Sequence, residues 1–437
     1  MSISNNSSPS TSQPVRKLER GVLVTRFFPS HPESSKTGIF QRLKLMLDAM
    51  QSACEALEVV FFLGPDVESD ANEQARLSAL AKQWMGNIEG CRLSVRIVAR
   101  RELASSTSLW GRYVPGVRSI FNQVPYSGYV AGRPLQVLEE ILASDPDILF
   151  CHQLESAVPL LRLGGRPKRL IVDLNDVEHV SLWRRMLRSP EWPSERLRLL
   201  HVPALAIGEY RVANLADQML VCSSTDADYL NRLWGKPKAL AVPNAVHVPK
   251  QLSTESNLPS TDTGAPVCLF LGTYNYGPNV DAATHMARDI WPLVQKESPT
   301  AELWLAGPAS ERLPAGIRDV RNVRVTGFVD DLEALYRRAS IVCCPIRAGS
   351  GTRIKILEAA TYGKAIISTR VGAEGIDLVP GESIEIADSA QQFADRCIEL
   401  LRDEKRRLAL GNGARELILE RYEYSAILKR LVAAIVK

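Results

Sequence analysis

The feature that most constrains the fold is a pattern that repeats along the chain from Gly21 onward. Each repeat has a short apolar run, a loop that carries Gly or Pro, and an amphipathic stretch. Strands and helices that alternate in this way are typical of a parallel β-sheet. The first strand is expected at residues 21–28, and apolar residues recur at helical spacing from Ile39 to Leu57 after it. The pattern therefore predicts an α/β fold.

The alternation occurs in two series, which a polar segment separates. Further strands of the first series are expected at residues 59–63, 93–98, 148–151, 170–173, 218–222 and 239–242. The segment 251–266 is rich in Ser, Thr and Pro, which is typical of a solvated linker. The second series predicts strands at residues 267–272, 302–306, 323–326, 341–344, 365–368 and 383–386. Each series would complete one doubly wound parallel sheet.

A chain of 437 residues is longer than one hydrophobic core usually serves, so two domains are expected. Two amphipathic helices, one before Tyr422 and one from Ser425 onward, are expected to close the chain. Ligands of open α/β sheets bind at the carboxyl ends of the strands, so the expected site is a cleft between the two sheets. The predicted organisation is a disordered tail at 1–18, an N-terminal Rossmann-like domain at 19–247, a linker at 248–266, a C-terminal Rossmann-like domain at 267–420 and a C-terminal helix at 421–437.

Composition narrows the class of partner. A net charge of +4, spread evenly along the chain, is too small to indicate nucleic acid but fits a phosphorylated small molecule. The eight cysteines lie mostly in apolar runs and have no metal-ligand spacing, as in reduced core residues. The N-terminus is polar and Ser-rich, and no segment has the roughly 20 apolar residues of a spanning helix. We therefore expect a cytoplasmic protein that is neither secreted nor membrane-spanning.

The most informative segment is a glycine-containing loop after the strand expected at 341–344, together with the helix that follows it. Thr352 is expected to cap this helix, whose N–H groups and dipole favour a pyrophosphate. Arg353 and Lys355 would add positive charge, and Glu358 can accept hydrogen bonds from both hydroxyls of a ribose. The alternative is that Lys355 and Glu358 form a surface pair and that the glycines form only a turn.

Several motifs, in this order and spacing, resemble one family of enzymes. They are VPNAV, FLGTYNYGPNVDA, GFVDDLEALYRRASIVCCP, GSGTRIKILEA and GKAIISTRVGAEGI. They resemble the donor-binding region of GT-B glycosyltransferases of the retaining family 4 group, or glycosyl transferases group 1. Within that group they resemble a branch whose donor loop reads GSGTRxKxLEA. The resemblance implies a GT-B fold, with two Rossmann-like domains facing a central cleft.

The resemblance also implies a nucleoside diphosphate sugar as donor, with Glu358 binding its ribose. Two departures from the commoner pattern concern the diphosphate and the sugar. Ser350 stands where a glutamate usually contacts the sugar, and Gly272 and Thr273 begin a segment where an Arg and a Lys usually hold the pyrophosphate. The residues expected to bind the donor are Gly272, Thr273, Phe328, Val329, Gly349, Ser350, Gly351, Thr352, Arg353, Lys355 and Glu358.

In the N-terminal domain, the resemblance places His152 and Gly38 near the reacting centre. His152 follows an expected strand, so it can also be read as a buried histidine at a strand end. Gly38 belongs to a loop with Lys36 and Thr37 that would touch acceptor and donor phosphate, although a glycine at a helix start is the simple alternative. Retaining enzymes of this kind are described as using front-face substitution, in which the protein mainly positions groups and stabilises charge.

A polar cluster after the strand at 170–173 is a second candidate for the acceptor side. Asp176 or Glu178 would line the acceptor side of the site, because loops at strand ends carry sites in this architecture. The alternative is that these side chains only cap the loop. The D-x-D sequence at Asp145 directly precedes a strand and contains Pro, so it predicts a turn. The pair Asp330 and Asp331 is likewise expected to cap a helix. No obligatory metal or cofactor is therefore expected.

Segments 110–133 and 183–198 mix aromatic with basic residues, which suits a surface bearing anionic lipids. Peripheral contact with the inner membrane surface is therefore one hypothesis, and partly buried helices are the alternative. The expected partners are a nucleotide sugar and a glycan or lipid-linked saccharide acceptor, in the assembly of cell-surface polysaccharide. A sugar-nucleotide 2-epimerase or a non-catalytic sugar-nucleotide-binding relative would have a similar fold.

Overall fold

The structure is a computed structural model that describes residues 17–29, 37–63, 71–99, 132–188, 199–248, 264–349 and 351–437. Several predictions fall outside these residues. They concern most of the N-terminal tail, most of the linker, the greater part of both aromatic and basic segments, and the side chains of Lys36 and Ser350.

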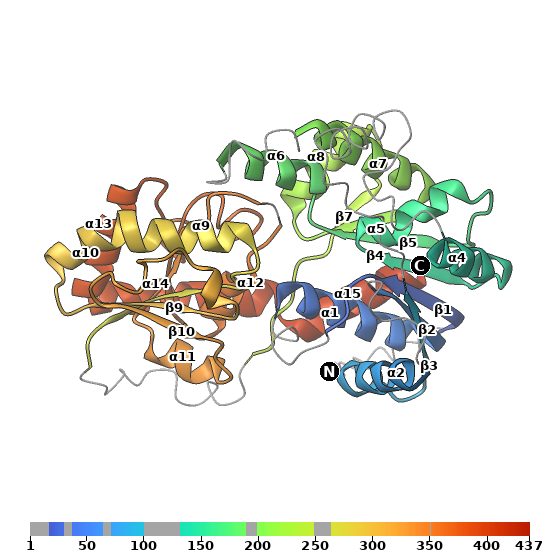
Figure 1. The fold of residues 1–437 in the computed structure, drawn as a ribbon, viewed down its shortest axis with the longest axis horizontal. Coiled ribbons are helices and arrows are strands. Elements are labelled where there is room, and N and C mark those ends of the chain that lie inside the picture. Colours follow the sequence, from blue (N-terminus) through green and yellow to red (C-terminus); the bar gives the residue numbers. More distant parts are fainter. Residues whose placement is uncertain are drawn as a thin grey trace, which may run out of the picture.

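The N-terminal domain is built on a parallel sheet with the Rossmann strand order β3-β2-β1-β4-β5-β6-β7 (Figure 1). Its order reverses between β1 and β4, which pair from Gly21 beside Ile148 to Thr25 beside His152. The strands are β1 (Leu18–Thr25), β2 (Cys54–Leu63), β3 (Arg92–Ala99), β4 (Ile148–His152), β5 (Leu170–Asn175), β6 (Gln218–Val221) and β7 (Ala239–Ala241).

Two hydrophobic clusters cover the two faces of this sheet, because successive side chains of a strand point to opposite sides. Val22 and Val24 pack with helices on one face, and Leu23 packs on the other. The helices of this domain are α1 (Gly38–Ala53), α2 (Ala71–Met85), α4 (Arg133–Ala143), α5 (Leu154–Ala157), α6 (Glu178–Arg188), α7 (His201–Leu215) and α8 (Ser224–Trp234).

The C-terminal domain repeats the architecture with a parallel sheet in the order β10-β9-β8-β11-β12-β13. A single hydrophobic cluster forms its core. The strands are β8 (Val267–Leu271), β9 (Glu302–Ala306), β10 (Val323–Gly327), β11 (Ile341–Cys344), β12 (Ala365–Ser368) and β13 (Glu385–Ile386). The helices are α9 (Gly277–His285), α10 (Trp291–Glu297), α11 (Leu332–Arg338), α12 (Ile354–Thr361), α13 (Ala390–Arg402) and α14 (Glu404–Arg421). The predicted cap at Asp331 is confirmed, since its side chain accepts a hydrogen bond from Ala334 N at 2.9 Å.

The last helix, α15 (Tyr424–Val436), returns to the N-terminal domain and lies beside α1 (Figure 1). Ile427, Leu431 and Ile435 are fully buried there, in the hydrophobic cluster of that domain. The Arg169 side chain donates hydrogen bonds to the carbonyl oxygens at the end of this helix, at 2.6 and 2.7 Å. The end of the chain is thus part of the core of the N-terminal domain.

The helical spacing expected from Ile39 to Leu57 extends beyond the end of the observed helix, so this part of the prediction is wrong. Helix α1 stops at Ala53, and Cys54 and Leu57 belong to β2. The strand begins directly after the helix, without a loop of turn residues, so apolar spacing alone could not separate the two elements.

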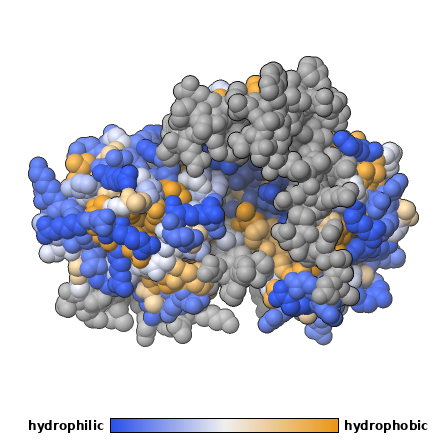
Figure 2. All heavy atoms as spheres, in the orientation of Figure 1, coloured by the Kyte–Doolittle hydropathy of each residue, from blue (hydrophilic) through white to orange (hydrophobic). Residues whose placement is uncertain are grey.

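Hydrophilic residues cover much of the described surface on the face shown in Figure 2, with smaller hydrophobic areas among them. Within the described ranges, the helices are too short or too polar to cross a bilayer.

Candidate functional site

A cleft with a volume of about 410 Å³ lies between the two domains, a size typical of small-molecule sites. Its walls are formed mainly by residues that follow the carboxyl ends of strands or begin helices. The N-terminal domain contributes Phe27, Thr37, Gly38, Ile39, Asn175, Asp176, Cys222 and Asn244. The C-terminal domain contributes Leu271, Gly272, Thr273, Asn275, Tyr276, Asn279, Gly307, Pro308, Phe328, Val329, Leu332, Thr352, Arg353, Ile354, Lys355 and Glu358.

The start of helix α12 differs from the prediction, because Thr352 does not cap it. The helix begins at Ile354 after Arg353, and no side chain caps it. The Thr352 hydroxyl instead accepts a hydrogen bond from Asn244 Nδ2 at 2.7 Å. The first N–H groups of an uncapped helix have no intrahelical partner and favour an anion, so this end of α12 suits a phosphate group.

Lys355 lies on the first turn of α12, with its ammonium group held among side chains of the C-terminal domain. Its Nζ donates a hydrogen bond to Asn279 Oδ1 at 2.9 Å and lies 4.4 Å from the centre of the Phe270 ring. Burial is the main cause that lowers the pKa of Lys355 to about 8, and the positive charge of Arg353 contributes to this shift. The loss of solvent thus leaves a cation that a bound anion would stabilise.

Glu358 lies one turn further along α12, where side chains from both domains fix its carboxylate. Gln41 of α1 donates a hydrogen bond to Oε1 at 2.8 Å, and the Tyr336 hydroxyl donates one to Oε2 at 3.1 Å. Burial raises the pKa of Glu358, although these two hydrogen bonds oppose the shift. Each carboxylate oxygen can accept a further hydrogen bond, so the group can still bind a pair of hydroxyls.

The two domains approach each other closely around the loop that precedes α12. Gly351 has a φ of +74°, and a Cβ atom there would lie only 2.0 Å from Asp176 Oδ1. A Cβ atom on Gly38 would lie 3.2 Å from Ile354 Cδ1 across the same boundary. Burial raises the pKa of Asp176 to about 6, while the positive charge of Arg353 lowers it. Only glycine leaves room for this approach at position 351.

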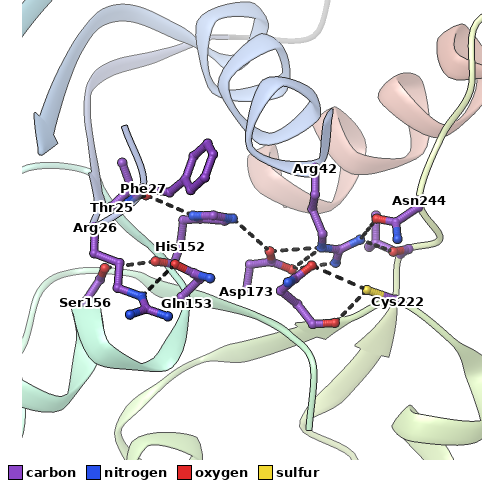
Figure 3. A network of polar contacts seen from close by, with 12 residues as sticks. Thr25, Arg26, Phe27, Arg42, His152, Gln153, Ser156, Asp173, Cys222 and Asn244 are labelled. Atoms are coloured by element: carbon purple, nitrogen blue, oxygen red, sulfur yellow. Dashed lines mark hydrogen bonds and ion pairs between the residues drawn. The ribbon is translucent and has the colours of Figure 1, made fainter. Parts of the chain in front are cut away.

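His152 lies at the carboxyl end of β4 in a buried polar network (Figure 3). Its Nδ1 is 2.9 Å from Thr25 Oγ1, and its Nε2 is 3.9 Å from Asp173 Oδ2. Burial lowers the pKa of His152 to about 4, so the imidazole is neutral near pH 7. The side chain is fully buried and is not among the residues that line the cleft. Its contact with a substrate therefore stays a prediction.

The remaining predicted residues have different positions relative to the cleft. Glu178 and Gly349 are not among its lining residues, although the Gly349 carbonyl oxygen accepts a hydrogen bond from Arg184 Nη1 at 3.3 Å. Burial raises the pKa of Glu178, and nearby carboxylates, Glu155 first among them, raise it further. The structure thus brings most of the predicted donor residues to one cleft, together with Thr37, Gly38 and Asp176.

Three residues that hold side chains of the cleft in place were not singled out from the sequence. Asn279 connects the loop after β8 to α12, because its Nδ2 donates a hydrogen bond to Thr273 O at 2.8 Å while its Oδ1 accepts from Lys355. Gln41 and Asn244 reach the other domain. Asn279 and Asn244 lie in the segments YNYGPN and VPNAV, where an Asn near Gly or Pro was the available signal.

Among the described residues, one group has ligand atoms close enough together for a metal ion. It consists of Cys268, Cys343 and Cys397, whose sulfur atoms lie within 4.8 Å of one another. All three are free, fully buried in the core of the C-terminal domain and absent from the cleft lining.

Comparison with known proteins agrees with this architecture. Residues 265–403 match the family model described as Glycosyl transferases group 1. A phosphatidyl-myo-inositol mannosyltransferase of Mycobacterium tuberculosis is 27% identical over 210 residues, which are 44% of this chain and 53% of that protein. The matched segments span about half the length of the curated relatives.

Solved structures match nearly the whole chain. Sucrose-phosphate synthase from Thermosynechococcus elongatus has a TM-score of 0.63 at 15% identity, covering 95% of this chain and 98% of that one. HepE of Anabaena in complex with UDP has a TM-score of 0.61 at 13% identity, covering 96% and 99%. The chain thus has the GT-B fold, and its segment 265–403 matches the family model of glycosyl transferases group 1.

Proposed function

We propose that the protein is a glycosyltransferase that moves a sugar from a nucleoside diphosphate sugar to a glycan or lipid-linked saccharide. The reaction would proceed with retention, in the assembly of cell-surface polysaccharide. The observation that carries the proposal is the wall formed by α12. An uncapped helix end, the Lys355 ammonium group and the Glu358 carboxylate follow one another along it. These are the groups that a diphosphate and a ribose require.

The other parts of the donor and acceptor would meet the remaining walls of the cleft. The backbone near Phe328 and Val329 would contact the base, and Arg353 would counter the diphosphate charge. Gly38 and Asp176 lie on the opposite wall, so the acceptor would approach from the N-terminal domain. The narrow approach between Gly351 and Asp176 would help to hold the reacting groups in place. No metal or cofactor has a role in this proposal.

A thermal-shift screen against UDP-, GDP-, ADP- and dTDP-sugars tests the proposal. A ligand that binds only the folded state at about 100 times its Kd adds about 2.7 kcal/mol of stability, so the donor should raise Tm by several degrees. A transferase should then give a glycosylated product when acceptor is added. A flat response to every nucleotide sugar would contradict the proposal, and release of an epimerised nucleotide sugar without acceptor would indicate the epimerase instead.

Affinity for a nucleoside diphosphate should fall as pH rises through the pKa of Lys355, which is about 8. Lys355 is protonated below this pH and loses its charge above it, whereas bound diphosphate keeps it protonated. We expect Kd to rise about tenfold between pH 7 and pH 9, as measured by calorimetry. Lys355→Met should bind more weakly at pH 7 and show little pH dependence.

Lys364 provides a matched control for this measurement, because burial also lowers its pKa to about 8. Its Nζ donates a hydrogen bond to Arg337 O, and it does not line the cleft. Lys364→Met should therefore retain the full pH dependence. The role of Lys355 is refuted if Lys355→Met keeps that dependence as well.

A further inference from the structure

A buried ion pair fixes the segment that leads out of the N-terminal domain (Figure 3). Arg42 and Asp173 are both fully buried, and Arg42 donates to the two Asp173 carboxylate oxygens at 2.5 and 3.0 Å. The Nη1 donors of the guanidinium group contact the chain after β7. Arg42 Nη1 donates to Val242 O at 2.8 Å and to Asn244 Oδ1 at 3.1 Å.

The Arg42 guanidinium group determines how the Asn244 amide is oriented. A guanidinium group has only donors, so the Asn244 oxygen must face it and the amide nitrogen must point the other way. On that side Asn244 Nδ2 donates a hydrogen bond to Thr352 Oγ1 at 2.7 Å. Asn244 is buried, so both halves of its amide require these partners. A single side chain thus connects the ion pair of one domain to the donor loop of the other.

The Thr352 hydroxyl is left with its own proton to donate. A hydroxyl group has one O–H donor and two lone pairs, and Asn244 occupies one of the lone pairs. Thr352 lines the cleft immediately before the uncapped end of α12. Its neighbour Gly351 is in close contact with Asp176, which restricts the position of the same loop. An anion at the helix end would therefore meet a hydroxyl donor whose orientation is already set.

We propose that Asn244 is a positioning residue for the diphosphate site. It holds the Thr352 hydroxyl with its proton directed toward the terminal phosphate, and it ties the loop before α12 to the Arg42–Asp173 pair. This inference rests on the proposed function, since it requires a diphosphate at the end of α12. It adds that residues outside the C-terminal domain set the geometry of that site.

The test compares UDP with UMP, which lacks the terminal phosphate, and GDP with GMP in parallel. With whichever pair binds the wild-type protein, Asn244→Leu should weaken the diphosphate about tenfold, the size expected for one hydrogen bond to a charged group. The monophosphate should bind as before. Thr352→Val should have the same effect, and the double variant should lose nothing more, because both changes remove one shared contact.

Asn231→Leu is the matched control, because both halves of the Asn231 amide are hydrogen-bonded to Ala239 and the residue does not line the cleft. Asn231→Leu should leave the affinities for the diphosphate and for the monophosphate unchanged. Unchanged diphosphate binding in Asn244→Leu, equal weakening of both nucleotides, or additive losses in the double variant would each overturn the inference. A wild-type protein that binds neither diphosphate would overturn the proposed function, and this inference with it.

Discussion

With UDP as the nucleotide of the proposed donor, replacing Glu358 by Ala should weaken UDP binding by about 100-fold, because two hydrogen bonds from ribose hydroxyls to a charged acceptor would be lost. Hydrogen bonds from Gln41 to Oε1 at 2.8 Å and from Tyr336 to Oε2 at 3.1 Å already orient the carboxylate. The Glu358 side chain therefore loses little conformational entropy when the ribose binds. Calorimetry with UDP and with 2′,3′-dideoxy-UDP measures the effect. Only UDP should distinguish the wild-type protein from the variant, since the dideoxy nucleotide has no hydroxyls to lose.

Two further variants separate the ribose contact from the hydrogen bonds that orient Glu358. Glu358→Gln keeps one carbonyl oxygen without the charge, so its affinity should fall between those of wild type and Glu358→Ala. Gln41→Ala removes the partner from the N-terminal domain but leaves both carboxylate oxygens of Glu358. It should therefore reduce UDP affinity much less than Glu358→Ala does. If Glu358→Ala weakened UDP and the dideoxy nucleotide equally, Glu358 would be a structural residue rather than a ribose ligand.

The strands were predictable because their apolar runs depend only on local sequence. Each expected strand, from 21–28 to 383–386, overlaps a strand of the structure. The prediction failed where two elements meet without turn residues, as at Ala53 and Cys54. Sequence also gave no reason to place α15 in the N-terminal core, since its apolar stripe would fit either domain.

The wall of the cleft formed by α12 was predictable because one continuous segment forms it. Thr352, Arg353, Lys355 and Glu358 lie together because a loop and the first turns of one helix carry them. The hydrogen bonds that hold them come from residues far away in the chain, such as Gln41 and Asn244. Thr352 was expected to cap its own helix, but a partner about a hundred positions earlier binds its hydroxyl. Such pairs depend on how the two domains pack, so no periodic pattern in the sequence predicts them.

The Arg42–Asp173 pair should also dominate the stability of the N-terminal domain. Burial would lower the pKa of Arg42, but the Asp173 carboxylate raises it above its ordinary value. Arg42→Met removes one member of the pair and leaves a fully buried carboxylate without its counterion. Breaking a buried pair in this way costs about 3–5 kcal/mol of unfolding free energy. Chemical denaturation followed by circular dichroism should show the transition at a much lower denaturant concentration.

The physical cause can be isolated, because an unpaired buried charge costs more than the absence of both charges. Arg42→Met combined with Asp173→Leu should therefore recover much of the stability that Arg42→Met loses. Arg76→Met is the control for loss of an arginine alone, since Arg76 forms an exposed pair with Glu73 and should leave the transition unchanged. A double variant no more stable than Arg42→Met would assign the loss to the hydrogen bonds from Arg42 to Val242 and Asn244 instead. In that case the anchoring of the chain at Val242 and Asn244, rather than the buried charge, would limit the stability of this domain.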